Sequence, residues 1–355
     1  MRNLPFNTHA SVWDWHTLAR HPNWLVTLEP AELEELHACV GQILDTAKPL
    51  ETLTREDCSM PRLVQRLQSW RSQLLHGLGF LQVRGFEPEV NGRAYDACAF
   101  WAMGLHLGDR FVSQNKHGHL LGHVTDLGQS RSNVSQRGPY SSERIPFHVD
   151  ACDIVGLMCL APPKSGGESS VVSSGHLYNV MRERRPDLAA NLMRPVYRDR
   201  RDEIPRGKAP WYAIPVFSWY AGLLSANIEP TYIGSVARHF DGVNPHSEQL
   251  LEALEYAQTL SQELHFDIEF QPGDIQFVHN HTTFHSRKAF VDGDGPARRR
   301  HLLRLWVQAD DGRPLPDAFY GRQGDRASIK RPGGIFAPDT QPNVPLWSAA
   351  EEPRA

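Results

Sequence analysis

Between about residue 110 and residue 310, short strand-like segments alternate with turns rich in glycine and proline. Examples of these turns are 161–163 (APP), 165–167 (SGG) and 272–274 (PGD). The intervening segments, such as 153–160, 169–173 and 302–308, have the length and composition of strands. Many short strands separated by tight turns are typical of a β-sandwich or a jelly roll. The pattern therefore predicts a mainly β fold for this part of the chain.

The first 109 residues are predicted to be mostly helical. Apolar residues recur at helical spacing in 33–44, 63–74 and 95–105, with Pro30 at a favourable first position and Gly77 at a favourable end. Residues 79–85 alternate and predict a strand. In the β-rich part, one further helix is expected at 250–260, capped by Ser247, and two strands, 265–270 and 275–279, are expected on either side of a turn.

Composition excludes several classes of protein. The chain has 355 residues, 40% of them hydrophobic, and a formal net charge of −4, so no strong positive field favours nucleic acid or an anionic membrane. The five cysteines are scattered and form no C-x-x-C pair, which argues against a disulfide framework and a thiolate zinc site. No signal peptide is recognisable, and no stretch reaches the ~18 apolar residues of a membrane span. We therefore expect a cytoplasmic protein.

Neither an internal repeat nor a low-complexity linker divides the sequence. We expect a single domain over residues 1–355, with a helical part at about 1–109, a jelly-roll core at about 110–310 and a C-terminal wrap at about 311–355. The sequence leaves a homo-oligomer open.

The sharpest local motif is H-x-D at His148 and Asp150. In a strand, the period of two places both side chains on one face. One imidazole and one carboxylate, joined by a distant histidine, form the facial triad that holds non-haem Fe(II) and leaves coordination positions open. The motif is weak by itself in a chain with 18 histidines. The alternative is that Asp150 is a turn residue and His148 a buried structural histidine.

A second region offers three candidates for the distant histidine: His279, His281 and His285. An arginine-rich segment, 298–306, follows it. A buried strand does not normally carry arginines four residues apart, as Arg300 and Arg304 are, unless an anion lies beside them. A dicarboxylate is such an anion, and arginine suits bidentate recognition of carboxylates.

Taken in order, the H-x-D motif, the Gly-Gly turn, the distal histidine and the arginine-rich strand resemble the taurine dioxygenase (TauD/TfdA) family of Fe(II)- and 2-oxoglutarate-dependent oxygenases. The matching stretches are IPFHVDACDIVGLMCLAPPKSGGESSVVSS and PGDIQFVHNHTTFHSRKAF…RRRHLLRLWV. The resemblance implies a double-stranded β-helix (jelly roll, cupin-like) with flanking helices. It also implies an enzyme that uses Fe(II), 2-oxoglutarate and O2 to hydroxylate an unactivated C–H bond of a small organic substrate, with formation of succinate and CO2.

Carried over by position, the resemblance makes His148, Asp150 and His285 the catalytic iron ligands. It favours His285 because the family places this ligand where the chain has HSRKAF; spacing alone does not choose among the three late histidines. Asp150 also bears on the outcome of the reaction. Halogenating relatives replace this carboxylate with a small residue, so its presence favours hydroxylation, or a related desaturation or ring closure.

The resemblance also implies the residues that bind the cosubstrate. Arg300 matches the arginine that binds the distal carboxylate of 2-oxoglutarate, and Ser169 stands where the family often has a threonine sharing that carboxylate. Arg304 matches a second arginine, near the other carboxylate of the cosubstrate or near a substrate anion.

Other polar clusters have less specific interpretations. A solvent-exposed location is expected for the mixed charges of 198–203, and for Arg298 and Arg299. A loop at the mouth of the pocket is favoured over a second metal site for His117, His119 and His123. The aromatic residues of 211–220 suit a substrate pocket and core packing equally. Two rival functions remain: a non-catalytic binding or sensor protein on the same fold, and a zinc hydrolase, which gives no reason for Arg300 and Arg304.

Overall fold

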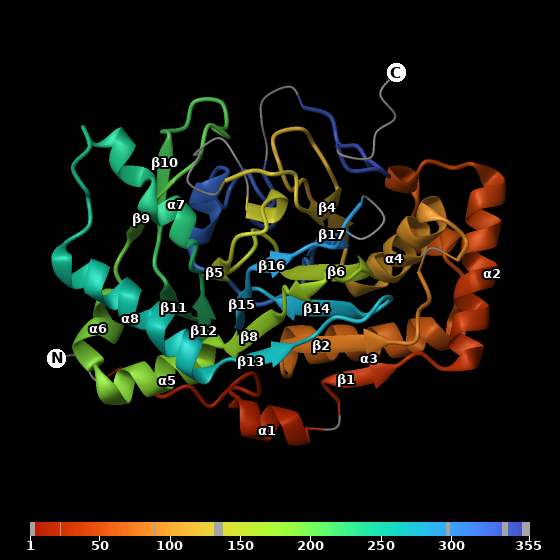
Figure 1. The fold of residues 1–355 in the computed structure, drawn as a ribbon. Helices are drawn as coiled ribbons and strands as arrows, with labels where there is room; N and C mark the ends of the chain where they lie inside the picture. The colour runs from red at the N-terminus through yellow and green to blue at the C-terminus, as the bar shows by residue number, and fades with distance from the viewer. Residues whose placement is uncertain are drawn as a thin grey trace.

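Two β-sheets face each other at the centre of the molecule, with helices outside both of them (Figure 1). The computed structural model describes residues 4–21, 23–88, 90–130, 138–295, 299–335 and 340–349. The larger sheet has the order β1-β2-β14-β6-β17-β3, with β4 also paired to β17, and the smaller sheet has the order β13-β8-β15-β5. All of these neighbours are antiparallel except β1 and β2.

The bounds of the strands follow the predicted pattern closely. The larger sheet contains β1 (Leu25–Thr27), β2 (Phe80–Arg84), β3 (Arg110–Phe111), β4 (Leu121–Thr125), β6 (Ile154–Ala161), β14 (Ile275–His279) and β17 (His301–Gln308). The smaller sheet contains β5 (Ile145–His148), β8 (Ser169–Ser173), β13 (Phe266–Ile268) and β15 (Thr283–Arg287). The two strands expected around the turn at 272–274 are β13 and β14. They belong to different sheets and do not pair with each other.

Apolar side chains fill the space between the two sheets. Val155, Val278 and Trp306 from the larger sheet join Val171 from the smaller sheet in one buried cluster. The next residue, Val172, belongs to another cluster on the opposite face, as the period of two requires. In the described part of the chain, no strand pair joins the two sheets, so they form an open sandwich of the predicted jelly-roll class.

Each sheet is covered on its outer face by helices. α2 (Pro30–Thr46), α3 (Pro61–His76) and α4 (Arg93–Leu107) share a core with the larger sheet, and α5 (Ser174–Arg184), α6 (Pro186–Asn191) and α8 (Glu248–Leu264) share one with the smaller sheet (Figure 1). The predicted caps are confirmed: Gly77 ends α3, and the Ser247 hydroxyl accepts a hydrogen bond from the Leu250 amide at the start of α8.

The expectation of a single helix in the β-rich part was wrong, because α5, α6 and α7 (Pro230–Gly234) also lie there. These helices are short and carry few apolar residues, so their periodicity is weak in the sequence. They bury their apolar side chains against strands and α8 instead.

Among the described residues, the remaining elements are α1 (Trp15–Arg20), three two-stranded ribbons and five 3-10 turns. The ribbons are β9 (Val196–Asp199) with β10 (Trp211–Ile214), β11 (Phe217–Tyr220) with β12 (Leu223–Ala226), and β7 (Ser165–Gly166) with β16 (Phe290–Val291). The 3-10 turns are Leu50–Thr52, Arg55–Asp57, Gly138–Tyr140, Val236–His239 and Asp317–Arg322. None of the helices described has the length and apolarity needed to cross a bilayer.

Candidate active site

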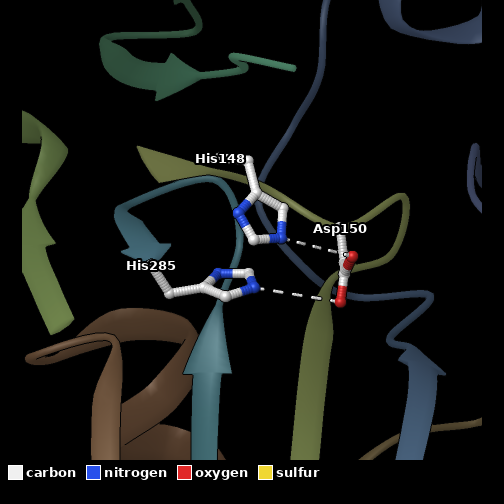
Figure 2. A group of neighbouring side chains, drawn as sticks. All are labelled: His148, Asp150 and His285. Atoms are coloured by element: carbon white, nitrogen blue, oxygen red, sulfur yellow. Dashed lines mark ion pairs between the residues drawn. The ribbon is translucent and has the colours of Figure 1, made fainter. Parts of the chain in front are cut away.

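Three side chains that lie far apart in the sequence converge at one end of the smaller sheet. His148, Asp150 and His285 each offer one ligand atom, and these atoms all lie within 4.8 Å of one another. Figure 2 shows both imidazole rings directed at the Asp150 carboxylate. The separations are 4.0 Å from His148 Nε2 to Oδ1 and 3.9 Å from His285 Nε2 to Oδ2. Both are too long for hydrogen bonds.

Strand pairing brings the two histidines together. β5 and β15 are antiparallel neighbours, and His148 and His285 are directly opposite each other in their register. Cross-strand partners point to the same face, and their ring centroids are 4.3 Å apart. β5 ends at His148, so the strand expected to include Asp150 stops two residues before it. The backbone of Asp150 is instead fixed by a hydrogen bond of 2.9 Å that its amide donates to Asn280 Oδ1.

The protonation of the site suits metal binding. His148 Nδ1 lies 2.9 Å from the Pro146 carbonyl and donates to it, which leaves the Nε2 lone pair facing Asp150. Burial, with the neighbouring His148, lowers the pKa of His285 to about 3, so this imidazole is neutral. Burial alone would raise the pKa of Asp150, but Arg304 and the two imidazoles outweigh it and keep the pKa below its ordinary value. The group thus combines the neutral imidazole of His285, the Nε2 atom of His148 and one carboxylate.

Two donors from β17 hold the Asp150 carboxylate. Trp306 Nε1 donates to Oδ2 at 2.9 Å, and Arg304 Nη1 donates to the same oxygen at 3.3 Å. Arg304 Nε also donates to Gln114 Oε1 at 2.7 Å, which fixes the guanidinium. The sequence interpretation placed Arg304 beside the cosubstrate or a substrate anion. In the structure it borders the same cavity and forms an ion pair with Asp150.

The three residues line a cavity of about 130 Å³ between the two sheets, together with Arg300 and Ser169. Arg300 is 3% exposed, and its Nη1 is buried without a hydrogen-bond partner. Burial lowers the pKa of Arg300 to about 10, which leaves the guanidinium charged at neutral pH. A Cβ on Gly167 would lie 3.2 Å from Arg300 Nε, and the residue has φ +76°, so this glycine makes room for the side chain. Ser169 Oγ lies 2.8 Å from Gln276 Oε1.

The competing histidines have other partners. His279 Nδ1 lies 3.1 Å from Thr282 Oγ1, and His281 Nε2 lies 3.0 Å from Asp153 Oδ1. His117, His119 and His123 line a second cavity of about 260 Å³. Within the described ranges, the group at Asp150 is the only set of three His, Cys, Asp or Glu side chains close enough to share an ion.

Two other sequence expectations concern charged segments. The mixed charges of 198–203 were expected to be exposed. This expectation was wrong for most of the run, because Arg198, Asp199, Arg200 and Arg201 are all buried. They lie at the end of β9, where Glu229 contacts Arg198 and where Asp199 contacts Arg238. Arg299 is exposed as expected, and Arg298 lies outside the described residues.

The donor set fits a divalent iron ion. Two atoms that each lie about 2.0–2.2 Å from one ion are about 3 Å apart when they are adjacent in an octahedron, and at most about 4.4 Å apart. The separations of 3.9 and 4.0 Å lie between these two values. Two imidazoles and one carboxylate on one side form the facial arrangement preferred by non-haem Fe(II). The unpartnered Arg300 nitrogen in the same cavity fits a carboxylate ligand.

Comparison with known proteins agrees with this chemistry. The model of the "Taurine catabolism dioxygenase TauD, TfdA family" matches residues 46–306. The chain belongs to this family. It is 31% identical over 330 residues to "FR-33289 synthase" of Streptomyces rubellomurinus, which covers 91% of this chain and 96% of that protein. It is 28% identical over 309 residues to "Taurine hydroxylase-like protein SAT17" of Stachybotrys chartarum, covering 84% of this chain and 79% of the relative.

Solved structures share the fold at low sequence identity. Asparagine oxygenase in complex with Fe(II), 2S,3S-3-hydroxyasparagine and succinate aligns with a TM-score of 0.63 and 18% identity, covering 81% of this chain and 94% of that one. Non-heme iron oxygenase OrfP in complex with Fe and alpha-ketoglutaric acid aligns with a TM-score of 0.60 and 16% identity, covering 80% and 93%. The predicted family, fold and cofactors are therefore confirmed: the protein is a TauD-family oxygenase that uses non-haem iron and 2-oxoglutarate.

Sequence reasoning missed several residues of the site. Trp306 and Gln114 contact Asp150 and Arg304, and Gln276 contacts Ser169. Trp306 follows Arg304 by two residues on β17, so the period of two was the signal that could have placed it on the same face. Gln114 and Gln276 carry no such signal, because their positions depend on how distant strands pack.

Proposed function

We propose that His148, Asp150 and His285 hold Fe(II), and that the enzyme hydroxylates a C–H bond of a small organic substrate. The observation that carries the proposal is the set of three ligand atoms within 4.8 Å, which border one cavity with a charged and incompletely bonded Arg300. The ligand atoms line a cavity between the two sheets and not an open surface, which suits a small molecule.

The cosubstrate lies, in this proposal, with its distal carboxylate on Arg300. The guanidinium supplies a charge-assisted hydrogen bond from Nη1, and the ring of Phe290, 5.3 Å from Cζ, keeps the group in place. Ser169 adds its hydroxyl to the same carboxylate when it gives up its contact with Gln276. Trp306 and Arg304 keep the Asp150 carboxylate oriented toward the metal.

Iron, when bound with 2-oxoglutarate and O2, supplies the oxidative decarboxylation to succinate and CO2 and the oxidation of the substrate. The chain's own part is to position these partners and to exclude water. The apolar side chains of Val124, Leu157 and Leu302 line the cavity and contribute to that exclusion.

The test is a screen for succinate formation under air with Fe(II), 2-oxoglutarate and a panel of small organic compounds. Wild-type protein should form succinate in a chelator-sensitive way, and Asp150→Ala protein at the same folded concentration should form none. Equal succinate from the two proteins would remove Asp150 from the ligand set. Wild-type protein that binds Fe(II) and 2-oxoglutarate yet forms no succinate with any compound would favour the binding or sensor function instead.

A further inference from the structure

Arg300, the proposed anchor of the cosubstrate, is buried without a carboxylate on its guanidinium. Its side chain is 3% exposed, and its Nη1 atom has no hydrogen-bond partner. Among the described residues, no carboxylate forms an ion pair with this guanidinium. A buried charge normally has a partner that neutralises it. The protein must therefore hold Arg300 in place by contacts that leave its charge available.

An aromatic ring supplies one of these contacts. Phe290 lies in β16 and is 6% exposed, and the centre of its ring is 5.3 Å from Arg300 Cζ and 4.8 Å from Arg287 Cζ. The face of an aromatic ring attracts a cation without neutralising it. A carboxylate in the same place would compete with the cosubstrate for the guanidinium, whereas the ring does not. Phe290 thus attracts Arg300 and leaves its hydrogen-bond donors to a ligand.

The second contact fixes the backbone of Arg300. Asp292 Oδ1 accepts a hydrogen bond of 2.7 Å from the Arg300 amide. Arg300 directly precedes β17, and the pairing of β17 with β6 shifts its register between His301 and Leu302. An irregularity of this kind changes the direction of the side chains beside it. The strand pairing alone therefore does not fix the direction of Arg300, and the contact with Asp292 adds a constraint from outside the sheet.

The ribbon of β7 and β16 brings both contacts close to Arg300. Gly166 pairs with Phe290 and has a φ of 74°, and a Cβ there would lie 2.3 Å from the Ala289 carbonyl oxygen. A Cβ on Gly167 would lie 3.2 Å from both Arg300 Nε and Phe290 Cβ. The two glycines therefore allow the ribbon to pack tightly against the guanidinium and the ring.

We propose that Phe290 and Asp292 are positioning residues that hold Arg300 in place for the distal carboxylate of 2-oxoglutarate. They thereby strengthen the preference of the site for 2-oxo acids with a second carboxylate. This inference rests on the proposed function, because Arg300 is the anchor in both. Without the two contacts, the guanidinium is mobile and must be ordered whenever the cosubstrate binds. Ordering one long side chain lowers affinity by about two- to tenfold.

The test measures binding to protein loaded with Zn(II), which allows no turnover. The probes are 2-oxoglutarate and 2-oxopentanoate, which has the same carbon chain and the same 2-oxo acid group but no distal carboxylate. Dissociation constants from ligand-observed NMR give the preference of each protein for the dicarboxylate. General damage to the fold or to the metal site weakens the binding of both probes alike, whereas a loss of positioning weakens the binding of 2-oxoglutarate alone.

Variants of Phe290 test the contact with the ring. Phe290→Leu keeps an apolar side chain but removes the ring, and should lower the preference by about two- to tenfold. Phe290→Tyr keeps the ring and should keep the preference. Val291→Ala changes the exposed neighbour in the same strand and is the matched control, which should bind both probes like wild type. A preference equal to that of wild type in Phe290→Leu protein, or an equal weakening of both probes, would overturn the role of Phe290.

Variants of Asp292 test the contact with the backbone. Asp292→Ala should lower the preference by a similar factor, whereas Asp292→Asn keeps an acceptor oxygen for the amide and should keep the preference. Asp294→Ala removes an exposed carboxylate of the same segment and is the matched control. An unchanged preference in Asp292→Ala protein would overturn the role of Asp292. If Phe290→Leu protein is misfolded, Asp292→Ala decides the inference, because its half-buried side chain is outside the apolar core.

Arg300→Ala separates this inference from the proposed function. It removes the anchor itself and should remove most of the preference for 2-oxoglutarate. If Arg300→Ala protein loses the preference while Phe290→Leu and Asp292→Ala proteins retain it, only the present inference fails. If wild type binds the two probes equally, or does not bind Zn(II) and 2-oxoglutarate, then Arg300 is not the anchor and both proposals fail.

Discussion

Asp150 and Asp153 are both buried, lie three residues apart, and each has a histidine and an arginine beside it, yet their surroundings differ in one respect. Asp153 is saturated: His281 lies at 3.0 Å, Arg331 Nε at 2.9 Å and the Ala309 amide at 3.0 Å. Around Asp150 the two imidazole nitrogens stop at 3.9 and 4.0 Å. The Asp153 carboxylate has its partners within the protein. The Asp150 carboxylate leaves a space of the size of a metal ion between itself and the two imidazoles.

The comparison shows how a structural carboxylate and a ligand carboxylate can be told apart without a bound ion. Both have a low pKa, because nearby positive or imidazole groups outweigh the effect of burial. The contact with the imidazoles separates them: His281 lies at hydrogen-bond distance from Asp153, whereas the imidazole nitrogens beside Asp150 are too far for a hydrogen bond yet close enough to share an ion with it. The following predictions test this difference.

The largest effect is expected for stability, from Asp153→Asn. This change leaves the buried Arg331 without a full charge partner, and breaking such a pair typically lowers the free energy of unfolding by about 3–5 kcal/mol. Urea unfolding measures the loss. The surface pair of Asp109 with Arg55 provides a control, because Asp109→Asn should cost less than about 1 kcal/mol. Metal affinity should be nearly unchanged in both variants.

Asp150→Asn should reduce metal affinity more than stability, the reverse of what is expected for Asp153→Asn. The amide keeps the shape of the side chain but removes the negative charge from the ligand set. Loss of a residue that hydrogen-bonds a metal ligand typically lowers metal affinity by about 10–100-fold, and the affinity for Fe(II) should fall by more than this here. Metal titration under anaerobic conditions measures it. The urea midpoint should fall less than in Asp153→Asn protein, because Arg304 keeps its hydrogen bond to Gln114 and borders the cavity. A large loss of stability with normal metal affinity would mean that Asp150 is a structural residue like Asp153.

Arg300→Ala should raise the concentration of 2-oxoglutarate required for half-maximal binding by about ten- to a hundred-fold, because a hydrogen bond to a charged group is lost. Equilibrium binding to protein loaded with Zn(II) provides the measurement. Arg299→Ala removes the adjacent but exposed guanidinium and serves as the matched control. Equal affinities in the two variants would show that the cosubstrate is anchored elsewhere.

A smaller effect is expected for Trp306→Phe. The ring still fills the space between the sheets, but Asp150 Oδ2 loses its donor at 2.9 Å. Metal affinity should fall by about tenfold, the lower end of the range for residues that hydrogen-bond a metal ligand, because Arg304 continues to hold the same oxygen. Metal affinity equal to that of wild type would mean that Arg304 alone orients the carboxylate.

The smallest effect concerns pH. The pKa of Asp153 is well below its ordinary value of 3.8 in the folded protein; burial alone would raise it, but the hydrogen bonds from His281 and Arg331 dominate. Its contribution to stability is therefore complete above pH 3.8 and is lost as the pH falls toward the folded pKa. The difference in unfolding free energy between wild type and Asp153→Asn should be constant from pH 5 to 7 and shrink below pH 4. A constant difference down to pH 3 would contradict this assignment.

Local regularities of the sequence predicted much of the fold. The strand at residues 169–173 and the helix that begins near Pro30 were found because periods of two and 3.6 depend only on neighbouring residues. Short elements with weak periodicity, such as α6, were missed because tertiary packing stabilises them.

The choice among His279, His281 and His285 shows more clearly what the sequence alone does not predict. His279 ends β14 in the larger sheet, and His285 lies in β15 of the smaller sheet, opposite His148. Neither the sheet nor the register follows from the spacing of the residues, so only the family resemblance favoured His285. The burial of Arg198 to Arg201 was missed for a related reason: charges in a polar run are usually solvated, whereas here β10 and α7 pack against β9.

The pair between Asp153 and Arg331 also has a consequence for the synthesis of the protein, because its members are 178 residues apart in the chain. At about 5–20 residues per second, the ribosome needs roughly 9 to 36 s to progress from one to the other. For most of this interval the emerging polypeptide contains Asp150 and β5 but lacks β15 and β17, which end at residues 287 and 308. The two sheets can therefore close over the site only after residue 308 has emerged, and the nascent chain exposes its apolar strand faces until then.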